Sequence, residues 1–169
     1  MRQIRKHVFE TNSSSCHSLG LASGCNEHDI SSLERYVEID GYLHMEFGEF
    51  GWEEDRYNDA YTKLQYILTF IAMKTPDVCI WCCSHPMDMD DINEKLKSSS
   101  DFIELNAIIE DELHCNGIWM DDGEGYIDHQ SHENYATVED LLSDYGISSA
   151  RDFIFNNNYY LETDNDNHY

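Results

Sequence analysis

Basic residues are scarce in this chain. Ten lysines and arginines stand against 34 aspartates and glutamates, which gives a formal net charge of −24 at pH 7. A surface of this charge repels nucleic acids and anionic membranes, so it argues against direct binding to either and favours a basic partner. Solubility alone, or a halophilic source, is the alternative explanation of the same charge.

Long apolar runs are also missing. The longest candidate, YILTFIAM at residues 66–73, is much too short to span a bilayer. The opening MRQIRKHVFE contains no apolar stretch of signal-peptide length. We therefore expect a cytoplasmic protein whose six cysteines are free thiols, or part of a metal site, and not disulfides.

Several motifs that identify common enzyme and binding classes are absent. The chain has no G-x-x-x-x-G-K-[ST] phosphate loop, no G-x-G-x-x-G, no H-E-x-x-H and no complete calcium-binding loop. The G-x-S-x-G elbow of serine hydrolases is also missing. These absences leave function to be argued from charge and from less specific residue clusters.

What is present suffices for one packed core. With 169 residues, 41% of them apolar and 12% aromatic, the chain has too little material for two comfortable cores. The predicted helices and strands, described in the next paragraph, follow one another in a mixed order without a regular βα repeat. We predict a single acidic α+β domain over residues 1–169, with a mostly antiparallel mixed sheet packed against about three helices.

Periodicity predicts the individual elements. Apolar spacing predicts a long amphipathic helix over 53–74 and shorter helices over 87–98, 101–114, 137–146 and 149–156. Alternation predicts strands at 4–9, 17–23, 117–120, 125–130 and 159–164, with the first two paired around a polar turn. Asp40-Gly41 predicts a hairpin, and 77–83 reads as a buried strand.

A zinc site is one chemical possibility. Cys79 and Cys82 have C-x-x-C spacing, and His85 is a third candidate ligand. If 77–83 is a strand, the two cysteines point to opposite faces and cannot share an ion. We therefore favour buried structural cysteines and predict no cofactor, with zinc as the alternative.

A second possibility is nucleophilic catalysis near the N-terminus. The stretch NSSSCHS offers Ser14, Ser15 and Cys16 as nucleophiles, but Cys16 and His17 are sequence neighbours whose side chains normally diverge. A base would have to come from elsewhere, and His129 in the segment IDHQS is the candidate. The stretch could instead hold an anion with nearby basic residues, or form only a polar turn.

The motif VFETNSSSCHSL resembles the N-terminus of a family of small, mostly uncharacterised bacterial and phage proteins. YIDHQS and FIFNNNYYLETDNDN are similar to further motifs of that family. The matching residues are Glu10, Asn12, Ser13, Ser14, Ser15, His17, Ser18, Asp128, His129 and Asn156. The resemblance implies a phage or mobile-element origin and no particular activity. In composition, the chain also resembles acidic anti-defence proteins, including anti-CRISPR proteins and DNA mimics.

These observations predict an inhibitor of a basic, nucleic-acid-binding host defence protein, such as a CRISPR effector. Carboxylates on a folded surface can replace phosphates against lysine and arginine, so an acidic face would occupy the partner's nucleic-acid groove. The predicted contact residues are Glu53, Glu54, Asp55, Asp59, Asp88, Asp90, Asp91, Glu94, Asp121, Asp122 and Glu124. The alternative is a small hydrolase or transferase, with or without a metal, whose site joins NSSSCHS to IDHQS.

Overall fold

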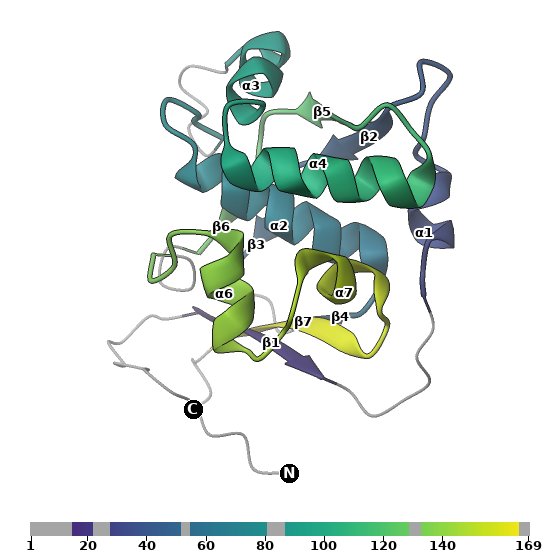
Figure 1. Ribbon diagram of the computed structural model, residues 1–169. Helices are drawn as coiled ribbons and strands as arrows, with labels where there is room; N and C mark the ends of the chain where they lie inside the picture. The colour runs from purple at the N-terminus through teal and green to yellow at the C-terminus, as the bar shows by residue number, and fades with distance from the viewer. Residues whose placement is uncertain (1–14, 22–27, 52–54, 81–86, 129–132, 166–169) are drawn as a thin grey trace.

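The computed structural model describes residues 15–21, 28–51, 55–80, 87–128 and 133–165 (Figure 1). Its helices are α1 (Ser31–Glu34), α2 (Ala60–Lys74), α3 (Met89–Leu96), α4 (Ser100–Leu113), α6 (Val138–Asp144) and α7 (Ala150–Phe155). Its strands are β1 (Ser15–Leu21), β2 (Leu43–Glu46), β3 (Glu49–Phe50), β4 (Asp55–Tyr57), β5 (Ile118–Asp122), β6 (Tyr126–Ile127) and β7 (Tyr159–Asn165). The predicted α+β fold is confirmed.

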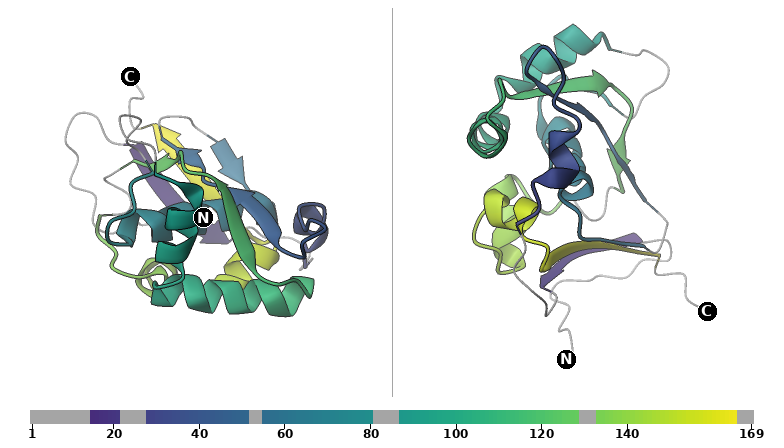
Figure 2. Two further views of the ribbon diagram at one scale, coloured as in Figure 1. Left: turned by 90° about the horizontal axis from the view of Figure 1, so that it is seen from above. Right: turned by 90° about the vertical axis from the view of Figure 1, so that its right-hand side faces the viewer.

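The strands form three small sheets. β7 lies between β1 and β4 in an antiparallel sheet, in which Leu19 pairs with Leu161. β2 pairs with β5 and β3 with β6, both in parallel, with Leu43 opposite Ile118. A parallel pair needs a long crossover, and here it contains α2, α3 and α4. Figure 2 (right) shows the antiparallel sheet and the β2–β5 pair at opposite ends of the molecule.

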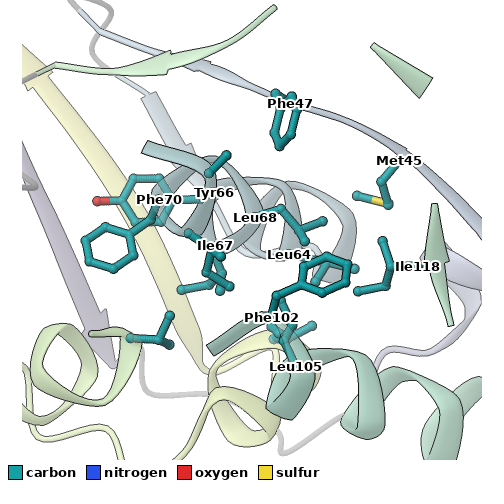
Figure 3. Close-up of a cluster of buried hydrophobic side chains, with 14 of the residues drawn as sticks. Met45, Phe47, Leu64, Tyr66, Ile67, Leu68, Phe70, Phe102, Leu105 and Ile118 are labelled. Atoms are coloured by element: carbon teal, nitrogen blue, oxygen red, sulfur yellow. The ribbon is translucent and has the colours of Figure 1, made fainter. Parts of the chain in front are cut away.

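Helix α2 lies in the centre and is buried nearly all round. Its buried residues are Ala60, Lys63, Leu64, Tyr66, Ile67, Leu68, Thr69, Phe70, Ile71 and Ala72. Figure 3 shows Leu64 and Leu68 near Met45 and Ile118, with Phe102 and Leu105 of α4 beside them. A helix that is apolar on all sides belongs inside a core, so α2 is the central helix and not the one-faced amphipathic helix that the sequence predicted.

The polar side chains of α2 bind backbone groups of the surrounding segments. Lys63 is fully buried, and its Nζ donates to the carbonyls of Asn156 (3.0 Å) and Tyr159 (3.3 Å). Burial lowers the pKa of Lys63 to about 8, against the opposing effect of nearby carboxylates. Thr69 Oγ1 accepts the amide of Gly48 at 2.9 Å. These bonds fix α2 to β7 on one side and to the β2–β3 connection on the other.

Two asparagines close the free edge of β5. Asn93 of α3 accepts from the Met120 amide and donates to the Met120 carbonyl, both at 2.9 Å. Asn106 of α4 accepts from the Ile118 amide at 2.8 Å. The side-chain amides therefore take the place of a further strand, which protects an edge that would otherwise expose unpaired backbone groups.

Several local predictions are confirmed. α3, α4, α6, α7, β5, β6 and β7 lie where periodicity placed them. Thr137 accepts from the Asp140 amide (3.1 Å) as the N-cap of α6, and Gly146 ends that helix with φ of 71°. Strand β1 is also present. Its described partner is β7, whereas the predicted partner at 4–9 lies outside the described residues.

Two element predictions are wrong, and a third is confirmed only in short form. The helix predicted from residue 53 begins at Ala60, because Asp55–Tyr57 pair with β7 as a strand. The hairpin at Asp40-Gly41 is present but short: Gly41 has φ of 85°, and Val37 and Leu43 form a single antiparallel bridge. In this bridge the Glu38 amide donates to Tyr42 and the His44 amide to Tyr36. In the described part of 77–83 there is no strand, since Asp77 adopts a left-handed backbone (φ 60°) and Val78 bonds back to Thr75.

Removal of the Asn93 amide tests its role at the strand edge. Asn93→Ala leaves the buried Met120 amide and carbonyl without their partner, so we expect a loss of about 2–4 kcal/mol in the free energy of unfolding. Urea denaturation measures it. Glu94→Ala, at the next and exposed position of α3, is the matched control and should change stability by less than about 0.5 kcal/mol. Equal effects of the two substitutions would contradict the assigned role.

Candidate interaction surface

Two of the predicted groups of carboxylates lie side by side. We define the acidic surface as seven exposed carboxylate residues. They are Asp88, Asp90, Asp91 and Glu94 of the α3 region, and Asp121, Asp122 and Glu124 at the end of β5. Gly123 lies against the side chains of Met89 and Ile92 of α3, and Asn93 bonds to β5 directly. The fold therefore holds these seven carboxylates on one rigid unit.

Local chemistry explains why α3 carries its acids at one end. Asp88 is the N-cap and accepts from the Asp90 amide at 2.9 Å, while Asp90 and Asp91 lie in the first turn, where the helix dipole favours negative charge. Lys95 and Lys97 follow near the helix end. Lys97 Nζ lies 2.8 Å from Glu94, and Lys95 Nζ lies 4.0 Å from Asp91.

This internal neutralisation is partial. Across the ranges that the structure describes, no lysine, arginine or histidine lies within ion-pair distance of Asp90, Asp122 or Glu124. Exposed lysine–carboxylate pairs contribute little and are screened by salt. The acidic surface therefore keeps a net negative charge that is available to a basic partner.

The third predicted group does not join this surface. Glu53 and Glu54 lie outside the described residues. Asp55 is on β4 in the antiparallel sheet, remote from α3 (Figures 1 and 2). Asp59 is the N-cap of α2 and accepts from the Thr62 amide at 2.8 Å. The assumption that these four residues share the first turns of one helix is therefore wrong.

The outward face of the β2–β5 pair borders the acidic surface, and sequence reasoning missed most of it. Leu43, Met45, Ile118 and Met120 are buried, so the alternate residues Tyr42, His44 and Trp119 point outward. The exposed Asp121 joins them through its bond to His44, and the exposed Glu46 follows a β-bulge after Met45. The rings of Tyr42 and Trp119 meet edge to face with centroids 6.3 Å apart. The alternation of apolar and polar residues at 42–46 and 118–121 was the available signal.

His44 ties this face to the turn before β2. Its Nδ1 lies 2.8 Å from Asp121 and its Nε2 lies 3.1 Å from Asp40, so the imidazolium donates to both carboxylates. Partial burial acts to lower the pKa of His44, but the hydrogen bonds to Asp121 and Asp40 outweigh it and the pKa is raised. A hydrogen bond from the Tyr42 amide and a weaker contribution from the hydrogen bond with His44 lower the pKa of Asp40.

The residues of the predicted catalytic site are only partly described. Ser15, Cys16 and His17 lie on β1, while Ser14 and His129 lie outside the described residues. Asp128, the residue before His129, is buried, and its amide donates to the Phe50 carbonyl at 2.9 Å. The structure thus fixes the backbone of β1 and the end of β6, but not the two side chains that would have to meet.

Chain connectivity limits how far apart these segments lie. Asp55 is paired with Thr163, which is paired with His17 on the other side of β7. Phe50 is five residue steps before Asp55, and five extended steps span at most about 18 Å. The short connection therefore joins the end of β6 to β4, and β1 lies across β7 from β4 in the same sheet.

The predicted zinc ligands also fall mostly outside the description. Cys79 is partly buried, and its amide faces the Met87 sulfur at 3.2 Å, whereas Cys82 and His85 are not described. Because 77–80 is not a strand, the alternation that separated Cys79 from Cys82 does not apply. Within the described ranges, no three His, Cys, Asp or Glu side chains are grouped so that they could hold a metal ion.

Comparison with known proteins adds no assignment. No family model, curated protein or solved structure matches the chain. Among the described helices, none has the length and apolar character needed to cross a membrane.

The histidine bridge predicts a pH dependence of stability. Because the pKa of His44 is raised in the folded state, its stabilisation is complete below the unfolded pKa of about 6.5 and is lost as pH rises through the folded pKa. The urea midpoint should therefore fall as pH rises above about 6.5, and His44→Gln should remove the part of this fall that the histidine causes. Asp121→Asn, which keeps the imidazole but removes a carboxylate, should reduce the same fall. An unchanged pH profile in both variants would contradict the bridge.

Proposed function

We propose that the protein inhibits a basic, nucleic-acid-binding host protein by presenting the acidic surface as a substitute for nucleic-acid phosphates. The observation that carries the proposal is the placement of seven exposed carboxylates from α3 and the end of β5 on one rigid unit. The N-terminal motif suggests a phage or mobile-element origin, and the likeness in composition to acidic anti-defence proteins suggests the class of partner, a defence protein such as a CRISPR effector acting in the bacterial cytoplasm.

The physical basis is counterion release and geometric matching. A groove that binds phosphates carries ordered lysines and arginines, and a carboxylate surface that meets them releases their counterions as nucleic acid does. Matching requires that carboxylates keep fixed separations. Asn93 supports this by fixing α3 to β5 with two hydrogen bonds to Met120.

Charge reversal tests the proposal. A partner is first captured from host lysate at low salt and released at high salt, and its affinity is then measured by titration. The triple substitution Asp90→Lys, Asp91→Lys and Glu124→Lys should weaken binding by about tenfold or more and flatten the dependence of affinity on salt.

The matched control reverses the same number of charges elsewhere. Glu104, Glu133 and Glu139 are exposed and lie outside the acidic surface, on α4, before α6 and on α6. Their replacement by lysine leaves the proposed surface intact and should change affinity much less. If both triple variants lose affinity equally, the partner responds to net charge and the proposed surface is wrong.

A hydrolase or transferase is the second candidate. The short connection from Phe50 to Asp55 favours this candidate. The connection links the end of β6, next to His129, to the sheet that contains Cys16 and His17. In such a site, a serine or thiol of NSSSCHS would be the nucleophile and His129 the base, with a metal not required.

Alanine substitutions separate the two candidates. Turnover of chromogenic carboxylic, phosphate and thioester substrates is compared for the wild type, His17→Ala and His129→Ala, each shown to be folded by circular dichroism. An enzyme of this kind should lose about 100-fold or more in rate in both variants, whereas His28→Ala should retain its rate. A rate that survives both substitutions would contradict the catalytic site.

A further inference from the structure

We propose that the outward face of β2–β5 binds an arginine side chain of the basic partner, with Trp119 as the stacking surface and Asp121 and Glu46 as the paired carboxylates. This inference rests on the proposed function and names the chemical group that the acidic surface recognises. It adds to that function a preference for arginine over lysine, which charge alone does not produce.

The first observation is that, among the described residues, this sheet face is partly exposed. Parallel strands are usually covered on both faces, and α2 and α4 pack on the inner side of β2 and β5. The side chain of Asp121 is 43% exposed and Glu46 is also exposed, so the two carboxylates of this face are accessible.

The second observation is the kind of side chain that lines the face. Trp119 is partly exposed and is held edge to face by Tyr42. Its ring already has a cation near it, since Lys97 Nζ lies 5.7 Å from the ring centroid. Indole is the best aromatic partner for a cation, and tryptophan, tyrosine and arginine are the residues that dominate binding energy at interfaces.

The third observation is the position of the carboxylates around the ring. Asp121 bonds to His44, the residue that pairs with Trp119, and Glu46 follows a β-bulge after Met45 and pairs with Asp122. His44 Nδ1 lies 2.8 Å and 3.0 Å from the two carboxylate oxygens of Asp121, so a guanidinium would use the lone pairs of these oxygens that His44 does not occupy. An acidic rim beside an aromatic ring complements a group that is both flat and positively charged.

Guanidinium has these properties and ammonium does not. A planar guanidinium can lie on the indole ring while its N–H groups donate in its own plane to two carboxylate oxygens. A lysine ammonium is more strongly hydrated and presents a point charge, so it gains less from the ring. The face should therefore discriminate between two partners of equal charge.

Peptides of matched charge test the inference without a known partner. Isotope-labelled full-length protein is titrated with capped hexa-arginine and capped hexa-lysine, and the indole N–H signal of Trp119, identified from Trp119→Phe, is followed by NMR. We expect hexa-arginine to shift this signal and to bind about three- to fivefold more tightly than hexa-lysine.

Variants show whether the ring causes the preference. Trp119→Leu should abolish the difference between the peptides, whereas Trp119→Tyr, which keeps an aromatic surface, should retain part of it. Tyr126→Leu, on β6 and outside this face, is the matched control and should keep the full difference. Equal binding of the two peptides to the wild type, or a difference that persists in Trp119→Leu, would overturn the inference.

The same titrations separate this inference from the proposed function. If the lysine substitutions at Asp90, Asp91 and Glu124 weaken both peptides while arginine shows no advantage, the acidic surface stands and the arginine site is wrong. If those substitutions leave the binding of both peptides unchanged, the acidic surface itself is wrong.

Discussion

The burial of α2 on nearly every side is the constraint on which the rest of the structure depends. A helix whose apolar residues cover all its faces must have packing partners on all of them. These partners are β7 and α7 on one side of α2, and β2, β5 and α4 on the other. Polar residues on such a helix must also find partners inside, which is why Lys63 and Thr69 bind backbone groups.

This arrangement decides which surfaces remain for function. The inner face of β2–β5 is occupied by the core, and the free edge of β5 is closed by Asn93 and Asn106. The outward face of the same strands is left, next to the exposed carboxylates of α3. The acidic surface and its aromatic neighbour are therefore consequences of how the sheet is attached to the central helix.

Sequence reasoning succeeded where the signal is local. The helices predicted over 87–98 and 137–146 are present as α3 and α6, and the N-cap of each, Asp88 or Thr137, lies next to its first residue. It failed where a distant partner decides. Residues 55–57 have a helical apolar spacing, but pairing with β7, more than 100 residues later, makes them a strand. The candidate site follows the same rule. Its carboxylates were named from the sequence, but that α3 and the end of β5 lie next to each other depends on the contact of Asn93 with β5.

The few basic residues are already engaged within the chain, so they leave most of the surface carboxylates without a neutralising partner. All seven lysines and arginines in the described ranges contact the chain's own residues, namely Arg35, Arg56, Lys63, Lys74, Lys95, Lys97 and Arg151. Arg151, for example, joins α7 to Asp111 and Glu112 of α4. Solubility would need only the amount of negative charge and not its position. The fixed placement of α3 against β5 gives the carboxylates a defined spacing, and a defined spacing is what recognition of an ordered set of cations requires.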